Sequence, residues 1–155
     1  MRFPTLSSRG IWLLLALSIA LWSTLFLWQK RDIRTPEVPR QVSIGEVLHS
    51  LEVADSEEER ATGLGGRDSL CERCAMLFVF DQSGKHGFWM KEMRFPLDIV
   101  WLRDGTIVHI KQHVLPEDRE VYRPSVEANQ VLEFNAGAAD SLRVGESVRF
   151  LFPGK

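Results

Sequence analysis

The stretch Leu97-Asp-Ile-Val-Trp-Leu-Arg-Asp-Gly-Thr-Ile-Val-His-Ile-Lys-Gln-His-Val114 decides the fold class of this chain. Two runs rich in β-branched and apolar residues, 97–102 and 106–114, are separated by Arg103-Asp104-Gly105. Asp-Gly between two such runs is a strong signal for a tight β-hairpin, because its residues tolerate the positive φ that the turn requires. The stretch therefore predicts two antiparallel strands.

Runs of the same kind extend the β pattern in both directions from this hairpin. Residues 75–80 form a continuous apolar run, which predicts a strand buried on both faces. Residues 42–53 alternate polar and apolar side chains and predict one or two strands, broken near Gly45. Shorter runs predict strands at 87–91, 130–134 and 148–152, and the proline-containing stretch 115–127 predicts a loop.

Two short segments carry helical signals. Ser56 is followed three residues later by Glu59, which is the pattern of a capping box at a helix start. Gly63 ends that helix after barely two turns. Residues 136–142 predict a second short helix.

Strands thus outnumber helices, and the hairpin and short turns favour antiparallel pairing. The sequence predicts one mainly β globular domain over residues 42–155, with two short helices. Its architecture is expected to be a small antiparallel sandwich or a partly closed barrel. A domain of this size buries enough surface to fold without a metal or disulfide.

Charge is divided unevenly along the chain. Residues 1–40 hold six Lys and Arg against two Asp and Glu, whereas residues 41–155 hold thirteen against nineteen. The globular part is therefore acidic. Surfaces that bind nucleic acid need clustered Lys and Arg to neutralise phosphates. Because the sequence shows no basic stripe, it argues against nucleic acid as a partner.

The first forty residues predict a membrane anchor. After a basic segment at 1–10, residues 11–28 carry no charge. As a helix rising about 1.5 Å per residue they span about 27 Å, close to the hydrocarbon thickness of a bilayer. Trp12 and Trp28 mark the two ends, where aromatic rings favour the membrane interface. Residues 29–41, with prolines among charged residues, predict an extended linker.

Cleavage and orientation of this segment stay open. A cleaved secretory signal is the competing interpretation, but the bulky residues 26–28 do not offer the small side chains of a cleavage site. More basic residues follow the helix than precede it, which by charge alone favours a cytoplasmic domain. The layout of an export signal and the paired cysteines favour the opposite side. We adopt a single-pass membrane protein with an extracytoplasmic domain as the prediction.

Several distinct sequence motifs lie along the domain between about Val53 and Phe150. They are Ala54-Asp55-Ser56, Glu59-Arg60-Ala61-Thr62-Gly63-Leu64, Met76-Leu77-Phe78-Val79-Phe80, Phe88-Trp89-Met90-Lys91, Pro96-Leu97-Asp98-Ile99-Val100, Val131-Leu132-Glu133, Ala136-Gly137 and Val144-Gly145-Glu146. With these motifs the domain resembles the bacterial and archaeal family called domain of unknown function 192. The resemblance implies a compact, jelly-roll-like β domain, often behind an export signal or lipid anchor, and no established activity.

The chain departs from the family pattern at three places. Gly65 stands where the family has Met, Ala75 stands where it tends to have Gly, and Glu92-Met93 replaces Asn-Thr. These departures weaken any activity assigned through those positions.

Four residues are candidates for ligand binding: Arg60, Trp89, Lys91 and Asp98. Asp98 precedes an apolar run, so we expect it to need a cationic partner, and Lys91, Arg94 and Arg60 are the nearest by motif. Two interpretations stay open: a structural ion pair, or a pocket in which Lys91 or Arg60 meets an anionic or hydroxylated group. Trp89 is either a core residue or a flat platform for a sugar or aromatic ligand.

Cys71 and Cys74 form a Cys-x-x-Cys pair. In redox enzymes such a pair sits at a helix N-terminus, where the dipole lowers the thiol pKa, whereas here it precedes a predicted strand. A local disulfide or two reduced thiols is therefore favoured over redox catalysis. A zinc site with His109 and His113 is disfavoured, because the gap between the pairs exceeds the roughly 12 to 15 residues of a zinc finger. We expect no metal and no cofactor.

These features leave three functions open. The first is a membrane-anchored module of the cell envelope that binds an unidentified small molecule or protein. The second is a small enzyme whose pocket is built from Arg60, Lys91 and Asp98. The third and weakest is a thiol redox protein that uses Cys71 and Cys74. Convergence of the three residues of the second hypothesis on a water-accessible pocket would favour the enzyme.

Overall fold

A computed structural model describes residues 38–153 of the chain, which belong to the second of two compact units, residues 37–155. Seven strands in this part form one sheet in the order β5-β4-β6-β3-β2-β1-β7. The elements are β1 (Gln41–Ile44), β2 (Val47–Ala54), α2 (Glu57–Thr62), β3 (Cys74–Gly84), β4 (Leu97–Arg103), β5 (Thr106–Val114), β6 (Ala128–Asn135) and β7 (Arg149–Leu151). The described residues are therefore mainly β, as predicted.

The predicted anchor at residues 11–28 lies outside the described residues. Residues 38–153 contain no helix that is long and apolar enough to span a bilayer.

The predicted hairpin is confirmed. Strands β4 and β5 are antiparallel, and Arg103 pairs with Thr106 across the two-residue turn. Asp104 has φ of 50° and Gly105 has φ of 78°, so both turn residues adopt the positive φ of a tight hairpin turn. The break at Gly45 between β1 and β2 and the capping box of Ser56 and Glu59 are confirmed as well.

The sheet curls until its two edge strands approach each other. The segment before β7 pairs with the start of β5, where Gly145 N donates to Ile107 O at 2.8 Å and Ile107 N donates to Glu146 O at 2.8 Å. One end of the sheet is closed in this way, so the architecture is a partly closed barrel, the second of the two predicted alternatives.

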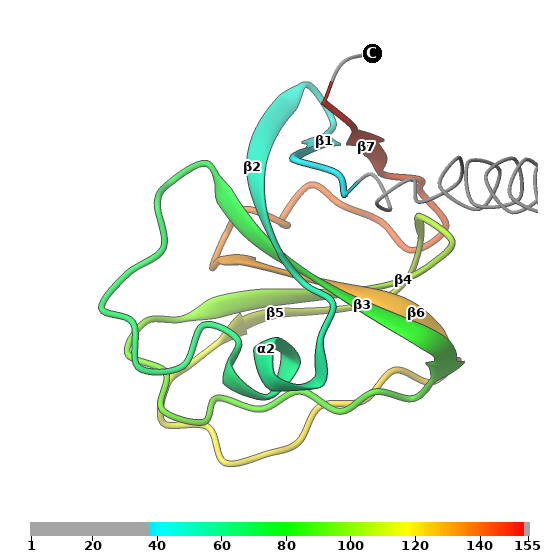
Figure 1. Cartoon of the computed structure of the whole chain (residues 1–155). Coiled ribbons are helices and arrows are strands. Elements are labelled where there is room, and N and C mark those ends of the chain that lie inside the picture. The colour runs from blue at the N-terminus through cyan, green and yellow to red at the C-terminus, as the bar shows by residue number, and fades with distance from the viewer. Residues whose placement is uncertain (1–37, 154–155) are drawn as a thin grey trace, which may run out of the picture. The chain divides into compact units, whose positions relative to one another are not determined.

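Each face of the curled sheet carries its own apolar cluster. Side chains of β1, β3, β4, β5 and β6 fill the inner cluster, which includes Leu77, Val100, Leu132 and Phe134. The outer cluster contains Met76, Phe78, Ile99, Trp101 and Val131 and is covered by α2 and the long loops. Figure 1 shows α2 and these loops on one side of β3, β4, β5 and β6, and β1 and β7 on the other.

Three local predictions are wrong. Residues 87–91 are not a strand, because they make only one bridge, Phe88 with Tyr122. Residues 136–142 form successive turns rather than a helix, because their backbone bonds run to the third residue back, from Ala138 N to Asn135 O and from Leu142 N to Ala139 O. Pairing is also not wholly antiparallel: β2 and β3 are parallel, because α2 and its loop carry the chain back to the same end of the sheet.

Candidate functional site

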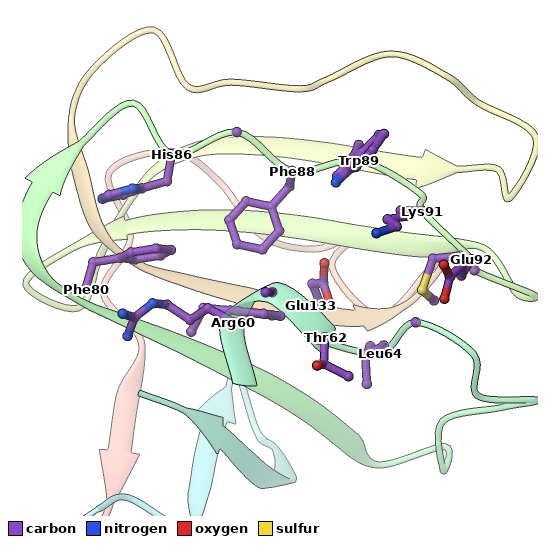
Figure 2. Close-up of a pocket in the computed structure, with 16 residues that line it drawn as sticks. Arg60, Thr62, Leu64, Phe80, His86, Phe88, Trp89, Lys91, Glu92 and Glu133 are labelled. Carbon is purple, nitrogen blue, oxygen red and sulfur yellow. The ribbon is translucent and has the colours of Figure 1, made fainter. Parts of the chain in front are cut away.

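A cavity of about 390 Å³ opens on the outer face of the sheet (Figure 2). Its lining comes from the end of α2 with the turn that follows it, from β3 and β6, and from residues 86–93. The cavity size falls at the lower end of the range of small-molecule sites. It brings together Arg60, Trp89 and Lys91, three of the four predicted binding residues.

Glu133 lies in the middle of this cavity. It stands on β6 opposite Met76 of β3 and Ile99 of β4, and only 6 % of its surface is exposed. Within residues 38–153 its carboxyl makes no hydrogen bond and no ion pair. A carboxyl group so nearly buried without a partner is costly for the fold.

Burial raises the pKa of Glu133 to about 8, because the charged form loses its hydration. At neutral pH most molecules therefore carry a protonated carboxyl here. A protonated carboxyl both donates and accepts hydrogen bonds, so it suits hydroxyl and carbonyl groups of a ligand.

The wall beside Glu133 is aromatic. Phe78 and Phe88 meet edge to face with their ring centroids 4.9 Å apart, and Phe80 stacks on His86 at 3.6 Å. Phe88 is fixed by two backbone hydrogen bonds with Tyr122, of 2.9 and 2.8 Å. These contacts hold the wall in one arrangement, as a preorganised site requires.

Trp89 stands at the rim and is 54 % exposed, so it is not a core residue. The Nζ of Lys91 lies 6.0 Å from the centroid of its ring, within the range of a cation–π contact. Lys91 makes no ion pair in the described part of the chain. The rim thus presents a flat apolar face and a cation beside it.

Arg60 lies at the end of the cavity away from Lys91 and stabilises the fold. Its Nη1 donates to the carbonyl oxygen of Val79 at 2.9 Å and also bonds that of Asp55. The guanidinium sits 5.3 Å from the centroid of Phe80. Arg60 therefore ties α2 to β3 and places a positive charge at the cavity edge.

Asp98 does not belong to this site. It lies on β4 next to Ile99, and since successive side chains of a strand point to opposite faces, it faces the inner cluster while Glu133 faces the cavity. Its carboxylate accepts N–H bonds from His113 at 2.8 Å, Gly137 at 2.8 Å and Ala139 at 2.9 Å. The predicted pairing with a Lys or Arg side chain is wrong, because backbone donors satisfy this buried charge.

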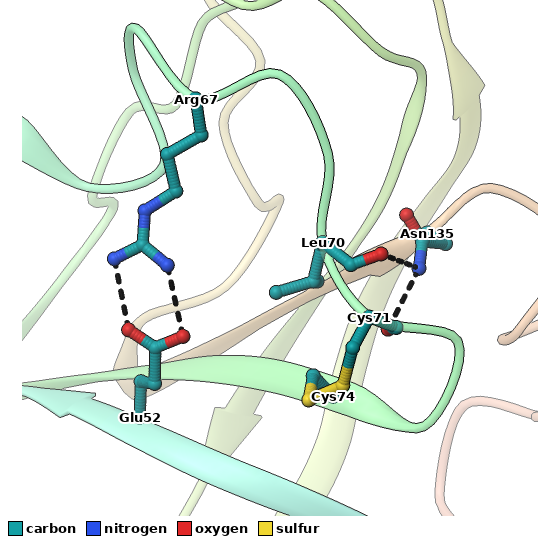
Figure 3. The surroundings of a disulfide bond; sticks show 6 residues. All are labelled: Glu52, Arg67, Leu70, Cys71, Cys74 and Asn135. Carbon is teal, nitrogen blue, oxygen red and sulfur yellow. Dashed lines mark hydrogen bonds and ion pairs between the residues drawn. A yellow bond between two sulfur atoms is a disulfide. The ribbon is translucent and has the colours of Figure 1, made fainter.

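Cys71 and Cys74 are joined in a disulfide where the loop enters β3 (Figure 3). Asn135 Nδ2 bonds the carbonyl oxygens of Leu70 and Cys71, both at 3.0 Å. The pair caps a turn before a strand, so no helix dipole acts on either sulfur. Residues 38–153 contain no cluster of three or more His, Cys, Asp or Glu able to hold a metal ion.

A family model matches residues 40–150, nearly all of the domain: DUF192, described as Uncharacterized ACR. The chain belongs to this family. Two solved structures share the fold of this DUF192 domain. A Sinorhizobium meliloti protein, proposed to be a transcription regulator, is 25% identical with a TM-score of 0.66, covering 71% of this chain and 90% of its own. A Novosphingobium aromaticivorans protein of unknown function is 27% identical with a TM-score of 0.66, covering 73% and 84%. No curated protein matches.

Two departures of this DUF192 domain from the family pattern meet in the cavity wall. A side chain at Gly65 would lie 3.3 Å from the carbonyl oxygen of Lys91 and 3.8 Å from Cβ of Glu92. Gly66 N donates to the carbonyl oxygen of Glu92 at 2.9 Å, and Glu92 has a positive φ of 58°. Two of the three departures, at Gly65 and at Glu92 with Met93, therefore line the same wall of the cavity, whereas Ala75 does not line it.

Glu133 was not among the predicted site residues, although the sequence carries a signal for it. In the predicted strand 130–134, Val131 and Glu133 lie two residues apart and so share a face. Val131 is fully buried, and the same face then holds a carboxyl group. An acidic residue on the apolar face of a strand is the pattern that points to this site.

Proposed function

We propose that this DUF192 domain is a ligand-binding module of the cell envelope, held to the membrane by residues 11–28. Its site is the cavity around Glu133, Trp89 and Lys91. One observation carries the proposal: a nearly buried carboxyl that has no partner among residues 38–153 opens into a preformed cavity, beside the ammonium group of Lys91 and the exposed Trp89.

The energetic cost of Glu133 supports a binding role. An apolar residue at this position would pack among Met76 and Ile99 without loss of hydration, so packing alone gives no reason for a carboxyl there. A ligand that hydrogen-bonds the carboxyl would recover part of that cost in the complex. Perturbed acids in cavities mark functional sites for this reason.

The location rests on two features. The apolar segment 11–28 is long enough to cross a bilayer, and the disulfide between Cys71 and Cys74 suits an oxidising compartment outside the cytoplasm.

A small enzyme is the second candidate, with Glu133 in the role predicted for Asp98. A pKa of about 8 lets Glu133 exchange a proton near neutral pH, as a general acid or base does. Turnover of a bound compound, abolished in Glu133→Gln without loss of binding, would establish this role.

A thermal-shift screen of small molecules on the detergent-purified full chain tests binding. Compounds that bind in the cavity should raise Tm of the wild type and of Val144→Ala, whose side chain is 63 % exposed and does not line the cavity, but not of Trp89→Ala. A screen without hits, or hits that Trp89→Ala leaves unchanged, would refute the proposed site.

A further inference from the structure

Positive charges outnumber negative charges around the cavity. Lys91 and Arg60 stand at its edge with one acid, Glu92, while Glu133 inside is uncharged in most molecules at neutral pH. The cavity as a whole is therefore positive on an acidic domain. Such a local charge favours an anion over a neutral or cationic ligand of the same shape.

The two cations are not equally available. Arg60 already donates to two backbone carbonyls and lies over Phe80, whereas the ammonium of Lys91 has the ring of Trp89 as its one polar or π contact among residues 38–153. Lys91 is thus the cation that a ligand anion would meet. Its ammonium can turn toward an anionic group, because a long flexible stem carries it.

The other groups at the cavity favour a ligand that has a ring with hydroxyl groups. Trp89 offers a flat face on which the C–H side of a sugar ring can lie. The Glu133 carboxyl provides both a donor and an acceptor, which suits a sugar hydroxyl that is also both. Thr62 and His86 add polar groups to the lining.

We propose that the ligand is an acidic sugar: its ring lies against Trp89, its carboxylate pairs with Lys91, and its hydroxyl groups bond the carboxyl of Glu133. This inference rests on the binding function proposed above and adds the chemical class of the ligand. A single sugar ring carrying one carboxylate offers a matching group to each of the three side chains.

Three sugars with the same ring and different charge test the class: glucuronate, glucose and glucosamine. Dissociation constants are measured by calorimetry at constant ionic strength on the full chain, in a detergent without a sugar headgroup. Glucuronate should bind about fivefold more tightly than glucose, the effect of one exposed ion pair of about 1 kcal/mol, and glucosamine more weakly than either.

Variants assign the discrimination to Lys91. Lys91→Met keeps the apolar stem over Trp89 and should abolish the preference, so that this variant binds glucuronate no more tightly than it binds glucose. Lys85→Met removes an exposed lysine of the preceding loop that does not line the cavity, and it should leave all three constants unchanged.

The outcomes separate the ligand class from the binding function. Equal binding of the three sugars, tightest binding of glucosamine, or a preference for glucuronate that persists in Lys91→Met overturns the acidic sugar. So does the absence of any sugar binding. If library compounds still lose their effect in Trp89→Ala, the binding function stands without this ligand class; if no compound binds, both fall.

Discussion

At the scale of single residues, the domain contains two buried carboxyl groups with different surroundings. Asp98 is fully buried and accepts three backbone N–H bonds, so its charge is satisfied and it holds β5 and the turn after β6 in place. Glu133 is nearly as buried and has no partner in the described residues. We therefore infer that Asp98 serves the fold and Glu133 serves the ligand.

Removing the Asp98 charge should destabilise the domain. Asp98→Asn would place an NH₂ group against backbone N–H donors, and we expect it to lower the free energy of unfolding by roughly 3 kcal/mol. Urea titration measures the change. Asp140→Asn is the matched control, because Asp140 is exposed and its contact with His113 should contribute little. Unchanged stability of Asp98→Asn would contradict the structural role.

Glu133 should make the domain less stable as pH rises. Its pKa is raised from 4.5 to about 8, so between these values the folded state holds a proton that the unfolded state has lost. Stability then falls with pH, by about 1 kcal/mol between pH 7 and 8. Glu133→Gln should lack this fall in stability. It keeps the contribution of His49 and His109, whose lowered pKa values change stability only below pH 7. Parallel pH curves for the two proteins would rule the explanation out.

Candidate site residues could be predicted only in part. Arg60, Trp89 and Lys91 follow from motif and residue type, and the structure brings them to one cavity. The alternation of a strand places Asp98 on one face, but which face the cavity lies on depends on the path of α2 and the loops. That path is not local, so the sequence alone paired Asp98 with the wrong partners and left Glu133 aside.

Elements whose signals are local were predicted well. The Asp104-Gly105 turn and the Ser56 cap depend on neighbouring residues alone, and both are present. The wrong predictions involve distant contacts. Residues 136–142 have a helical composition but form turns, and the segment is tied to β4 through the N–H groups of Gly137 and Ala139, which donate to Asp98. The parallel pairing of β2 with β3 likewise depends on how the intervening chain crosses the sheet.

The loop from α2 to β3 is held by several contacts, of which the disulfide is one. Arg67 forms a bidentate ion pair with Glu52, with two hydrogen bonds of 2.8 Å each. The side chain of Asn135 donates to the loop carbonyl oxygens of Leu70 and Cys71 (Figure 3). This loop begins at the cavity wall, at Gly63 and Gly65. Its rigidity should therefore support the shape of the site.

Loss of the disulfide should weaken the fold moderately. The bond closes a short loop with a sequence separation of 3, and loop entropy gives about 2 kcal/mol for such a bond. The double variant Cys71→Ser, Cys74→Ser should lose this amount in urea titration. Dithiothreitol should lower the free energy of unfolding of the wild type by the same amount and leave that of the double variant unchanged. Equal stability of oxidised and reduced wild type would contradict a structural disulfide.

On the scale of the whole molecule, the chain combines an acidic β domain with a basic, apolar N-terminal segment. We expect the full chain to sediment with membranes in alkaline carbonate, because an apolar helix is not released by charge. A variant without residues 1–37 should stay in the supernatant. Full chain in the supernatant would refute the anchor, and a new N-terminus after residue 28 would indicate cleavage.

The centre of the proposed site is the buried carboxyl of Glu133, which opens into the cavity. Its side-chain carboxyl can be observed directly by carbon NMR in full chain labelled at glutamate, with Glu133→Gln to assign the signal. We expect this signal to titrate near pH 8. A midpoint close to the ordinary 4.5 of a glutamate would show a solvated or paired carboxyl, and the proposed centre of the site would be wrong.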